Sequence, residues 1–457
     1  MAWFNFAIKF FNHCILKTIR IRKGLDIKMQ GVAEELISNK LTPKKYCIRP
    51  TDFHGITPKM DCKEGDRLKR GTIVFHDKDV PEICFVSPCS GVLKSIVRGE
   101  KRKILRVEIE ADGSDEAVTF DTNEDLKTLF SKAGIYPLIN QRPYGIVANP
   151  NATPRDIFIS FLDTSPLACN LEFALKDDVE YLKLAIRALY HFTSGNIYLS
   201  FGKDSRLAML MPDDPEIVKT EFVGKHPAGL VGTQINKLKP INKGETVWTI
   251  SASNLPIIGR LLKHGEYQPE KIVAVCGAEV VAPQYYKLKI GADLSQLRNG
   301  MLLSENVRII SGNVLTGINV TDNPYLGFNE MQVSVIPEGD DYEMFGWMLP
   351  GANKFSNSRT FLSMLTPWKR FNIDTNMHGE ERAYVVTGQY EKVCPLDIYP
   401  QLLVKAAMTD DIDKMEELGI YEVIEEDLAL CEFVCTSKIA VQQTIRHGLD
   451  LVRKEME

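Results

Sequence analysis

Short apolar runs, separated by turn residues, dominate residues 18–115. Ile19 and Ile21 alternate with arginines, and later runs such as 92–97 are bounded by Gly-Asp, Pro and Gly positions. This alternation is typical of short strands with tight turns, and no stretch carries helical periodicity of ordinary length. The pattern predicts a compact β module over residues 18–115.

From residue 116 to 262 the pattern changes to alternating strands and helices. Apolar residues recur at helical spacing over 123–133 and again after Asp178, which is placed to act as an N-cap. Bounded apolar runs over 157–161 and 197–199 read as strands. Because this order makes β-α-β units, it predicts a Rossmann-like α/β domain with a mostly parallel sheet over 116–262.

The remaining chain divides into a second β-rich module and a helical region. Residues 263–338 form the β module, and residues 339–457 are expected to be a C-terminal helical region. Its clearest helices are predicted over 397–408, 411–418 and 438–454. Residues 1–17 form an N-terminal extension, read either as an interfacial amphipathic helix or as a segment without a role. The fold class is thus α/β and multidomain.

Composition excludes several classes of protein. The 457 residues carry 55 Lys and Arg against 60 Asp and Glu, so the net charge of −5 gives no overall attraction to nucleic acid. No apolar run is long enough to predict a transmembrane segment. The ten cysteines include no C-x-x-C pair, and the first residues lack secretion features, which favours free thiols in a reducing compartment.

Motifs for intrinsic chemistry are missing from the sequence. There is no G-x-G-x-x-G, and Gly202-Lys203 lacks the surrounding residues of a phosphate loop. Cys431 and Cys435 are one helical turn apart, but two thiols do not complete a metal site, so they are expected to be buried structural residues. We therefore predict no catalytic, cofactor-binding or metal-binding residue in this chain.

Two segments are candidates for contacts. Between Lys94 and Arg106 six basic residues stand against a single acid, a pattern that fits a solvated loop as well as an acidic partner or anionic headgroups. The window 344–373 contains no acidic residue but keeps aromatic and basic ones. Such a composition is typical of an interface, or of a buried connection between domains.

One string within the first module resembles a known fold. Gly65-Asp66 through Gly71, the segment 75–78 and the turn 87–91 are similar to a biotinyl/lipoyl-like barrel-sandwich hybrid. In that family a lysine at a hairpin tip carries the cofactor, and Lys78 would be that lysine. Asp79, which follows it, departs from the family pattern, so we expect the fold without the attachment.

Most of the chain resembles one further family, the A subunits of the bacterial Na⁺-translocating NADH:quinone oxidoreductase. The resemblance begins at Ile19 and runs nearly to the end, and the insertion at 52–58 is similar to the Bacteroidetes-type version. Its strings are Ile19 to Asp26, Arg98 to Arg102, Gln141 to Tyr144, His226 to Gly229, Pro240 to Glu245, Asn353 to Ser356 and Asp427 to Cys435.

This resemblance implies a peripheral subunit on the cytoplasmic face of the inner membrane, associated with the membrane-bound B subunit. FAD, FMN, riboflavin and iron–sulfur centres are expected in partner subunits and no cofactor in this chain. The catalytic activity then belongs to the assembly. The stretch 285–321 resembles a soluble-ligand-binding β-grasp module whose ligand is undetermined, so a β-grasp fold is expected for 263–338.

A quinone or partner contact is predicted in the acid-free window. Trp368 and Phe371 would stack on a ring and Arg370 would lie near a ring oxygen, with Phe355 and Arg359 beside them. Two alternatives remain: a lipoyl or biotin carrier using Lys78, and an iron–sulfur subunit of a related electron-transport complex.

Overall fold

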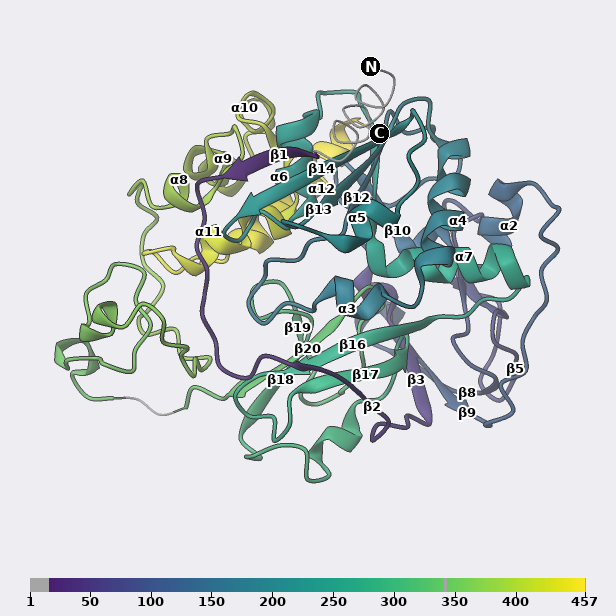
Figure 1. Cartoon of the computed structure of the whole chain (residues 1–457), viewed down its shortest axis with the longest axis horizontal. Helices are drawn as coiled ribbons and strands as arrows, with labels where there is room; N and C mark the ends of the chain where they lie inside the picture. The colour runs from purple at the N-terminus through teal and green to yellow at the C-terminus, as the bar shows by residue number, and fades with distance from the viewer. Residues whose placement is uncertain (1–15, 341–342, 457) are drawn as a thin grey trace, which may run out of the picture.

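Four sheets and a C-terminal set of helices make up the chain, seen in a computed structural model that describes residues 16–340 and 343–456 (Figure 1). The extension predicted over 1–17 lies outside the described residues except for Leu16 and Lys17. Lys17 already belongs to the first strand.

A seven-stranded sheet forms the α/β part, in the order β1-β14-β13-β12-β15-β10-β11. Its first five strands are mutually parallel, β10 runs antiparallel to them, and β11 pairs antiparallel with β10. Strands buried on both faces need near-continuous apolar runs, and Ile157, Phe158 and Ile159 of β12 are all buried. The strands are β1 Lys17–Ile21, β10 Ile139–Arg142, β11 Ile146–Val147, β12 Ile157–Ser160, β13 Ile197–Phe201, β14 Ile217–Gly224 and β15 Val247–Ser251.

The helices of the α/β part are α2 Leu126–Lys132, α3 Leu171–Leu175, α4 Val179–Leu189, α5 Arg206–Leu210, α6 Val231–Leu238 and α7 Leu255–His264. Of these, α3 packs against β16 (Glu270–Cys276) of another sheet. The apolar stripe of α4, including Leu182 and Ile186, is buried as its spacing predicts. Asp178 does not cap α4 with its side chain as predicted. Instead its carboxylate accepts from Arg260 of α7 at 2.9 Å, because α4 packs against α7.

Two smaller sheets form the β module. One has the order β3-β9-β8-β5 and the other β4-β6-β7. Their strands are β3 Lys45–Ile48, β4 Pro58–Met60, β5 Arg67–Leu68, β6 Ile73–Asp77, β7 Cys84–Val86, β8 Gly91–Arg98 and β9 Ile104–Ala111. Phe75 and Phe85 stack in their core with ring centroids 4.5 Å apart.

The first strands of the predicted 18–115 module pair elsewhere. β1 joins the seven-stranded sheet beside β14, and β2 joins a six-stranded sheet of order β19-β18-β20-β16-β17-β2. Alternation in the sequence predicts a strand but does not name its partner. The strands of the six-stranded sheet are β2 Glu34–Ser38, β16 Glu270–Cys276, β17 Gln284–Lys289, β18 Val307–Ser311, β19 Ile318–Asn319 and β20 Gln332–Pro337.

The C-terminal region is helical only in its second half. Within 343–389 the described residues form no α-helix, and this stretch makes an irregular lobe at the left of Figure 1. Prolines and left-handed glycines such as Gly351 interrupt any helical run there. The helices are α8 Tyr390–Val393, α9 Pro400–Met408, α10 Ile412–Glu417, α11 Ala429–Phe433 and α12 Val441–Met456. No helix in the described ranges is long and apolar enough to cross a membrane.

A buried ion pair joins the seven-stranded sheet to these helices. Arg142, at the end of β10, donates to Asp427 at 2.6 Å and to Glu426 at 2.7 Å. The side chains of Arg142 and Asp427 are only 2% and 1% exposed. Burial raises the pKa of Glu426 to about 7. Gly232 at the start of α6 permits the close approach, since a Cβ there would lie 2.1 Å from Asp427 Oδ1.

Removing the charge of Asp427 is expected to destabilise the chain strongly. Asp427→Asn leaves a buried guanidinium short of one counter-charge, which costs about 3 kcal/mol. The measurement is urea unfolding of the full chain. The control is Asp214→Asn, which breaks the exposed 3.6 Å pair with Arg187 and should change stability by less than about 0.5 kcal/mol. If the two substitutions lowered the free energy of unfolding equally, the stabilising role of the buried Arg142–Asp427 pair would be contradicted.

Candidate functional site

The carboxyl end of β12 is where ligands are expected in this type of sheet. β12 pairs with β13 on one side and with β15 on the other, so the order in which strands are added to the sheet reverses at β12. In open α/β sheets, loops that leave such a switch point open a crevice at the carboxyl ends of the strands. The loop after β12, residues 161–170, begins at this point.

A cavity of about 300 Å³ lies beside this loop. Three segments distant in the sequence form its walls: 26–29 after β1, 164–167 after β12, and part of the 343–389 lobe. The lining residues are Asp26, Ile27, Lys28, Met29, Thr164, Ser165, Pro166, Leu167, Trp368 and Arg370.

Backbone hydrogen bonds hold the lobe against the segment after β1. The amide of Phe371 donates to the carbonyl of Lys28 at 2.8 Å, and the amide of Gln30 donates back to Phe371 at 3.0 Å. Lys28 Nζ donates to the carbonyl of Pro367 at 2.8 Å. The cavity wall is therefore a short parallel pairing between residues more than three hundred positions apart in sequence.

The loop after β12 presents a hydroxyl without a partner. Ser165 is buried, and its Oγ has no hydrogen-bond partner among the described residues. Its amide donates to Asp163 Oδ1 at 2.8 Å, which fixes the loop, while burial raises the pKa of Asp163. A buried hydroxyl left unpaired is unfavourable, so a ligand acceptor placed here would be stabilised.

His226 does not line the cavity itself but contacts two residues that do. Its amide donates to Asp26 Oδ1 at 3.0 Å, and its Nδ1 lies 3.3 Å from Thr164 Oγ1. Gly24 lets the backbones meet, because a Cβ there would lie 2.2 Å from the carbonyl oxygen of His226. Burial lowers the pKa of His226 to about 4, so the imidazole is neutral near pH 7.

The structure separates the five residues predicted as a contact site. Trp368, 74% exposed, and Arg370 line the cavity. Phe371 does not line it: the residue is buried and packs edge-on against Phe355, with ring centroids 5.8 Å apart. Side chains alternate along an extended segment, which sends Arg370 and Phe371 in opposite directions. Arg359 is exposed and is also not one of the lining residues.

The acid-free window is not a buried connection between domains. Much of it is exposed, including Met344 and Leu365. Of the other residues singled out from the sequence, Lys78 is exposed on the turn after β6, and the expectation that it carries no cofactor stays a prediction. Cys431 and Cys435 are buried, as expected. Among residues 16–340 and 343–456, no three or more His, Cys, Asp or Glu side chains are grouped so as to hold a metal ion.

Sequence reasoning missed the cavity residues outside the acid-free window. Lys28 and Ser165 come from separate loops with no motif of their own. One signal was available, because Ile157 to Phe161 was read as a strand of a parallel sheet and the loop at its carboxyl end is a general ligand position. The arrangement offers an indole, the Arg370 guanidinium and a hydroxyl donor, which together suit an aromatic ring carrying carbonyl oxygens. The Asp26 carboxylate and Lys28, whose Nζ is already bonded to Pro367, also line the cavity.

Three family models match the chain in succession. Residues 19–112 match the NqrA N-terminal barrel-sandwich hybrid domain, which confirms that fold for the first module. Residues 121–267 match the NqrA second alpha/beta domain, and residues 272–322 match the model described as the NQRA C-terminal domain.

Full-length relatives carry a single name. The A subunit of the Na(+)-translocating NADH-quinone reductase of Histophilus somni (strain 2336) is 37% identical over 448 residues, covering 96% of this chain and 100% of the relative. That of Vibrio anguillarum is 36% identical with the same coverage. A solved NAD⁺-reducing [NiFe]-hydrogenase overlaps at a TM-score of 0.34 and 11% identity, over 66% of this chain and 55% of that one, which is too distant to support an inference.

The buried imidazole predicts a pH dependence of stability. Because the folded pKa of His226 is lowered from 6.5 to about 4, the unfolded chain takes up a proton first as the pH falls. Stability should therefore drop by up to about 1.4 kcal/mol per pH unit between these values. His226→Gln should remove this component, measured by urea unfolding from pH 7.5 to 4.5. His191→Gln removes an exposed imidazole and is the control. If it reduced the pH dependence of stability as much as His226→Gln, the assignment of this dependence to His226 would be contradicted.

Proposed function

The chain belongs to the family of A subunits of the Na(+)-translocating NADH-quinone reductase, and we propose that it serves that complex as a peripheral subunit without a redox cofactor of its own. The single observation that carries the membership is 37% identity over the full length of the relatives. The resemblance found in the sequence is confirmed by these matches. The complex is an oxidoreductase, and its activity is shared among its subunits.

The proposed site of action is the cytoplasmic face of the inner membrane, beside the membrane-bound B subunit. In this proposal flavins and iron–sulfur centres belong to the partner subunits. Visible absorption of the purified chain is the direct measurement, since a stoichiometric flavin or iron chromophore would overturn the cofactor-free part of the proposal. We also propose that residues 263–338, which hold most of the six-stranded sheet, form a β-grasp module.

The 343–389 lobe is proposed to dock onto the membrane subunits. It projects from the rest of the molecule in Figure 1 and exposes many large apolar side chains. These are Met344, Phe345, Met348, Leu349, Leu362, Met364, Leu365, Trp368, Met377, Val385 and Val386. A concentration of exposed apolar groups is typical of an interaction surface. The partner is inferred from the name of the relatives, which describes each of them as one subunit of a larger reductase.

A quinone contact is proposed for the cavity beside the same lobe. The indole of Trp368 can stack on a quinone ring, while Arg370 or the unpartnered Ser165 hydroxyl can donate to a ring oxygen. Lys28 also lines the cavity, but its Nζ is already bonded to Pro367. Of the five residues predicted from sequence, only Trp368 and Arg370 remain in this proposal as direct contacts.

Substitutions in the cavity are expected to weaken quinone use by the assembled complex. Trp368→Ala and Arg370→Ala should each raise the KM for quinone about tenfold, because a stacking face or a charged donor is lost. NADH oxidation with a water-soluble acceptor should not change. Lys369→Ala is the matched control, since Lys369 Nζ donates to the Ala352 carbonyl and does not line the cavity. Normal assembly with an unchanged quinone KM in both variants would remove the proposal.

Polar substitutions on the lobe are expected to weaken assembly. With a tagged chain, the double variant Met344→Ser and Met348→Ser should recover severalfold less flavin-bearing membrane subunit than the parent, because apolar area at the interface is lost. Met209→Ser provides the control, as Met209 is an equally exposed methionine on α5. The docking proposal fails if the double variant and this control recover equal amounts.

A further inference from the structure

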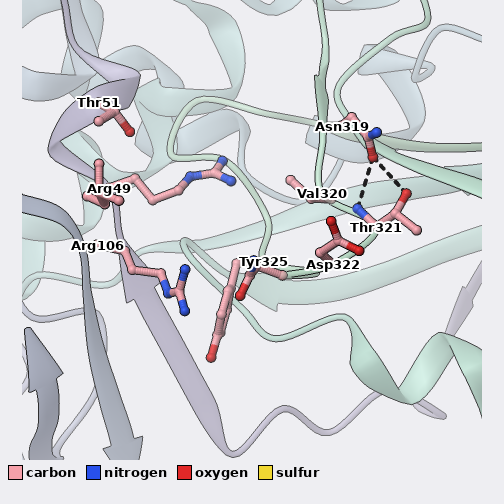
Figure 2. Close-up of a pocket in the computed structure, with 10 residues that line it drawn as sticks. Arg49, Thr51, Arg106, Asn319, Val320, Thr321, Asp322 and Tyr325 are labelled. Atoms are coloured by element: carbon pink, nitrogen blue, oxygen red, sulfur yellow. Dashed lines mark hydrogen bonds between the residues drawn. The ribbon is translucent and has the colours of Figure 1, made fainter. Parts of the chain in front are cut away.

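A second cavity lies between the β module and the six-stranded sheet, and two arginines form one of its walls. β3 and β9 pair antiparallel with Ile48 facing Val107. Arg49 follows Ile48 and Arg106 precedes Val107, so both side chains leave the same end of this ladder. Figure 2 shows the two guanidinium groups extending toward the loop that carries Asn319 to Tyr325. Like charges at adjacent cross-strand positions are unfavourable unless something neutralises them.

Neighbouring carboxylates occupy only part of each guanidinium. Arg49 Nε donates to Asp52 Oδ2 at 3.2 Å, and Arg106 Nε donates to Glu108 Oε1 at 2.7 Å. The terminal nitrogens of Arg106 have no hydrogen-bond partner in the described part of the chain. Arg49 Nη2 is buried and also lacks one there. A buried N–H of a charged group is costly to leave unpaired, so Arg49 Nη2 favours an acceptor. The Arg106 side chain is partly exposed, and its terminal nitrogens are open to the same acceptor.

The opposite wall of the cavity is polar. Within its turn, Asn319 Oδ1 accepts from both the amide and the hydroxyl of Thr321, which fixes the course of the backbone there. Burial raises the pKa of Tyr325, which keeps its hydroxyl a protonated donor. The cavity measures about 260 Å³, slightly below the range of about 300–1,000 Å³ typical of small-molecule sites. Its size therefore suits a compact polar group.

The surrounding charge favours an anion. Arg106 pairs with Val97 near the tip of the β8–β9 hairpin, and this exposed tip carries Lys101, Arg102 and Lys103. A cluster of one sign beside a cleft raises the local concentration of ions of the opposite sign. Asp322 is the one acidic residue that lines the cavity, and it is exposed. A ligand that also carries a hydroxyl or amino group would give this carboxylate a donor.

We propose that the cavity between Arg49 and Arg106 binds a phosphate group, with the two guanidinium edges on its oxygens and the hairpin tip attracting it from solution. Guanidinium forks match phosphate geometry, and two forks approaching from adjacent strands can engage more oxygens than a carboxylate presents. The phosphate belongs either to a phospholipid headgroup or to a soluble phosphate ester, which share this chemistry.

Binding to the full purified chain tests the proposal. The probes are inorganic phosphate and glycerol 1-phosphate by calorimetry, and vesicles of phosphatidylglycerol or phosphatidylcholine by sedimentation. Arg106→Gln should weaken glycerol 1-phosphate binding about tenfold or more, as expected for loss of a charged donor. Arg49→Gln should act similarly, but Arg106→Gln is the primary variant because Arg106 is the less buried of the two. Arg187→Gln on α4 removes an exposed arginine elsewhere as the control.

The two sources give different results. A lipid source predicts that Arg106→Gln also loses binding to phosphatidylglycerol vesicles, with phosphatidylcholine bound by neither protein. A soluble source predicts that vesicle binding is unchanged while glycerol 1-phosphate binding falls; both results support the phosphate site. The proposal is overturned if the parent shows no saturable binding of any probe, or if Arg106→Gln and Arg187→Gln bind every probe equally.

Discussion

The connection between β1 and β2 holds three parts of the molecule together through main-chain hydrogen bonds. At one end β1 extends the seven-stranded sheet, and at the other β2 extends the six-stranded sheet. Between them, Lys28 and Gln30 pair with Phe371 of the lobe. These main-chain hydrogen bonds fix the path of the segment between the two sheets. The cavity at the end of β12 exists because that path passes beside it.

A buried ion pair holds the second junction, between β10 and the C-terminal helices. Arg142 and Asp427 are almost fully buried, and charges removed from water depend on good mutual geometry. A pair of this kind specifies how β10 meets the C-terminal helices, because any displacement leaves a charge unpaired. The 343–389 lobe has no comparable buried pair among the ion pairs of its described residues. The molecule thus combines a firmly joined body with a lobe that is attached at two places. One is the pairing with residues 28–30, and the other is a set of hydrogen bonds from residues 382–388 to Ser437 and Gln401.

Sequence patterns predicted the elements well and their partners poorly. Strands such as β12 and helices such as α4 follow from local periodicity, and the family strings identified the module order. Periodicity did not assign β1 and β2 to distant sheets, because pairing depends on residues hundreds of positions away. The absence of acidic residues identified the window 344–373, which includes Trp368 and Arg370. Only the structure shows that side chains alternate along this segment, so that Phe371 points into the core. Ser165 carried no local signal.

The pairing of β1 with β14 has a consequence for how the chain is made. The hydrogen bond from Thr18 to Glu221 spans 203 residues, so the first strand leaves the ribosome long before its partner is synthesised. At translation rates of about 5–20 residues per second the delay is on the order of 10–40 s. During that interval the β module has all of its own strands and can fold, whereas the nascent amino-terminal strand has an unsatisfied edge. Chaperone binding to the nascent chain would be most useful during that interval.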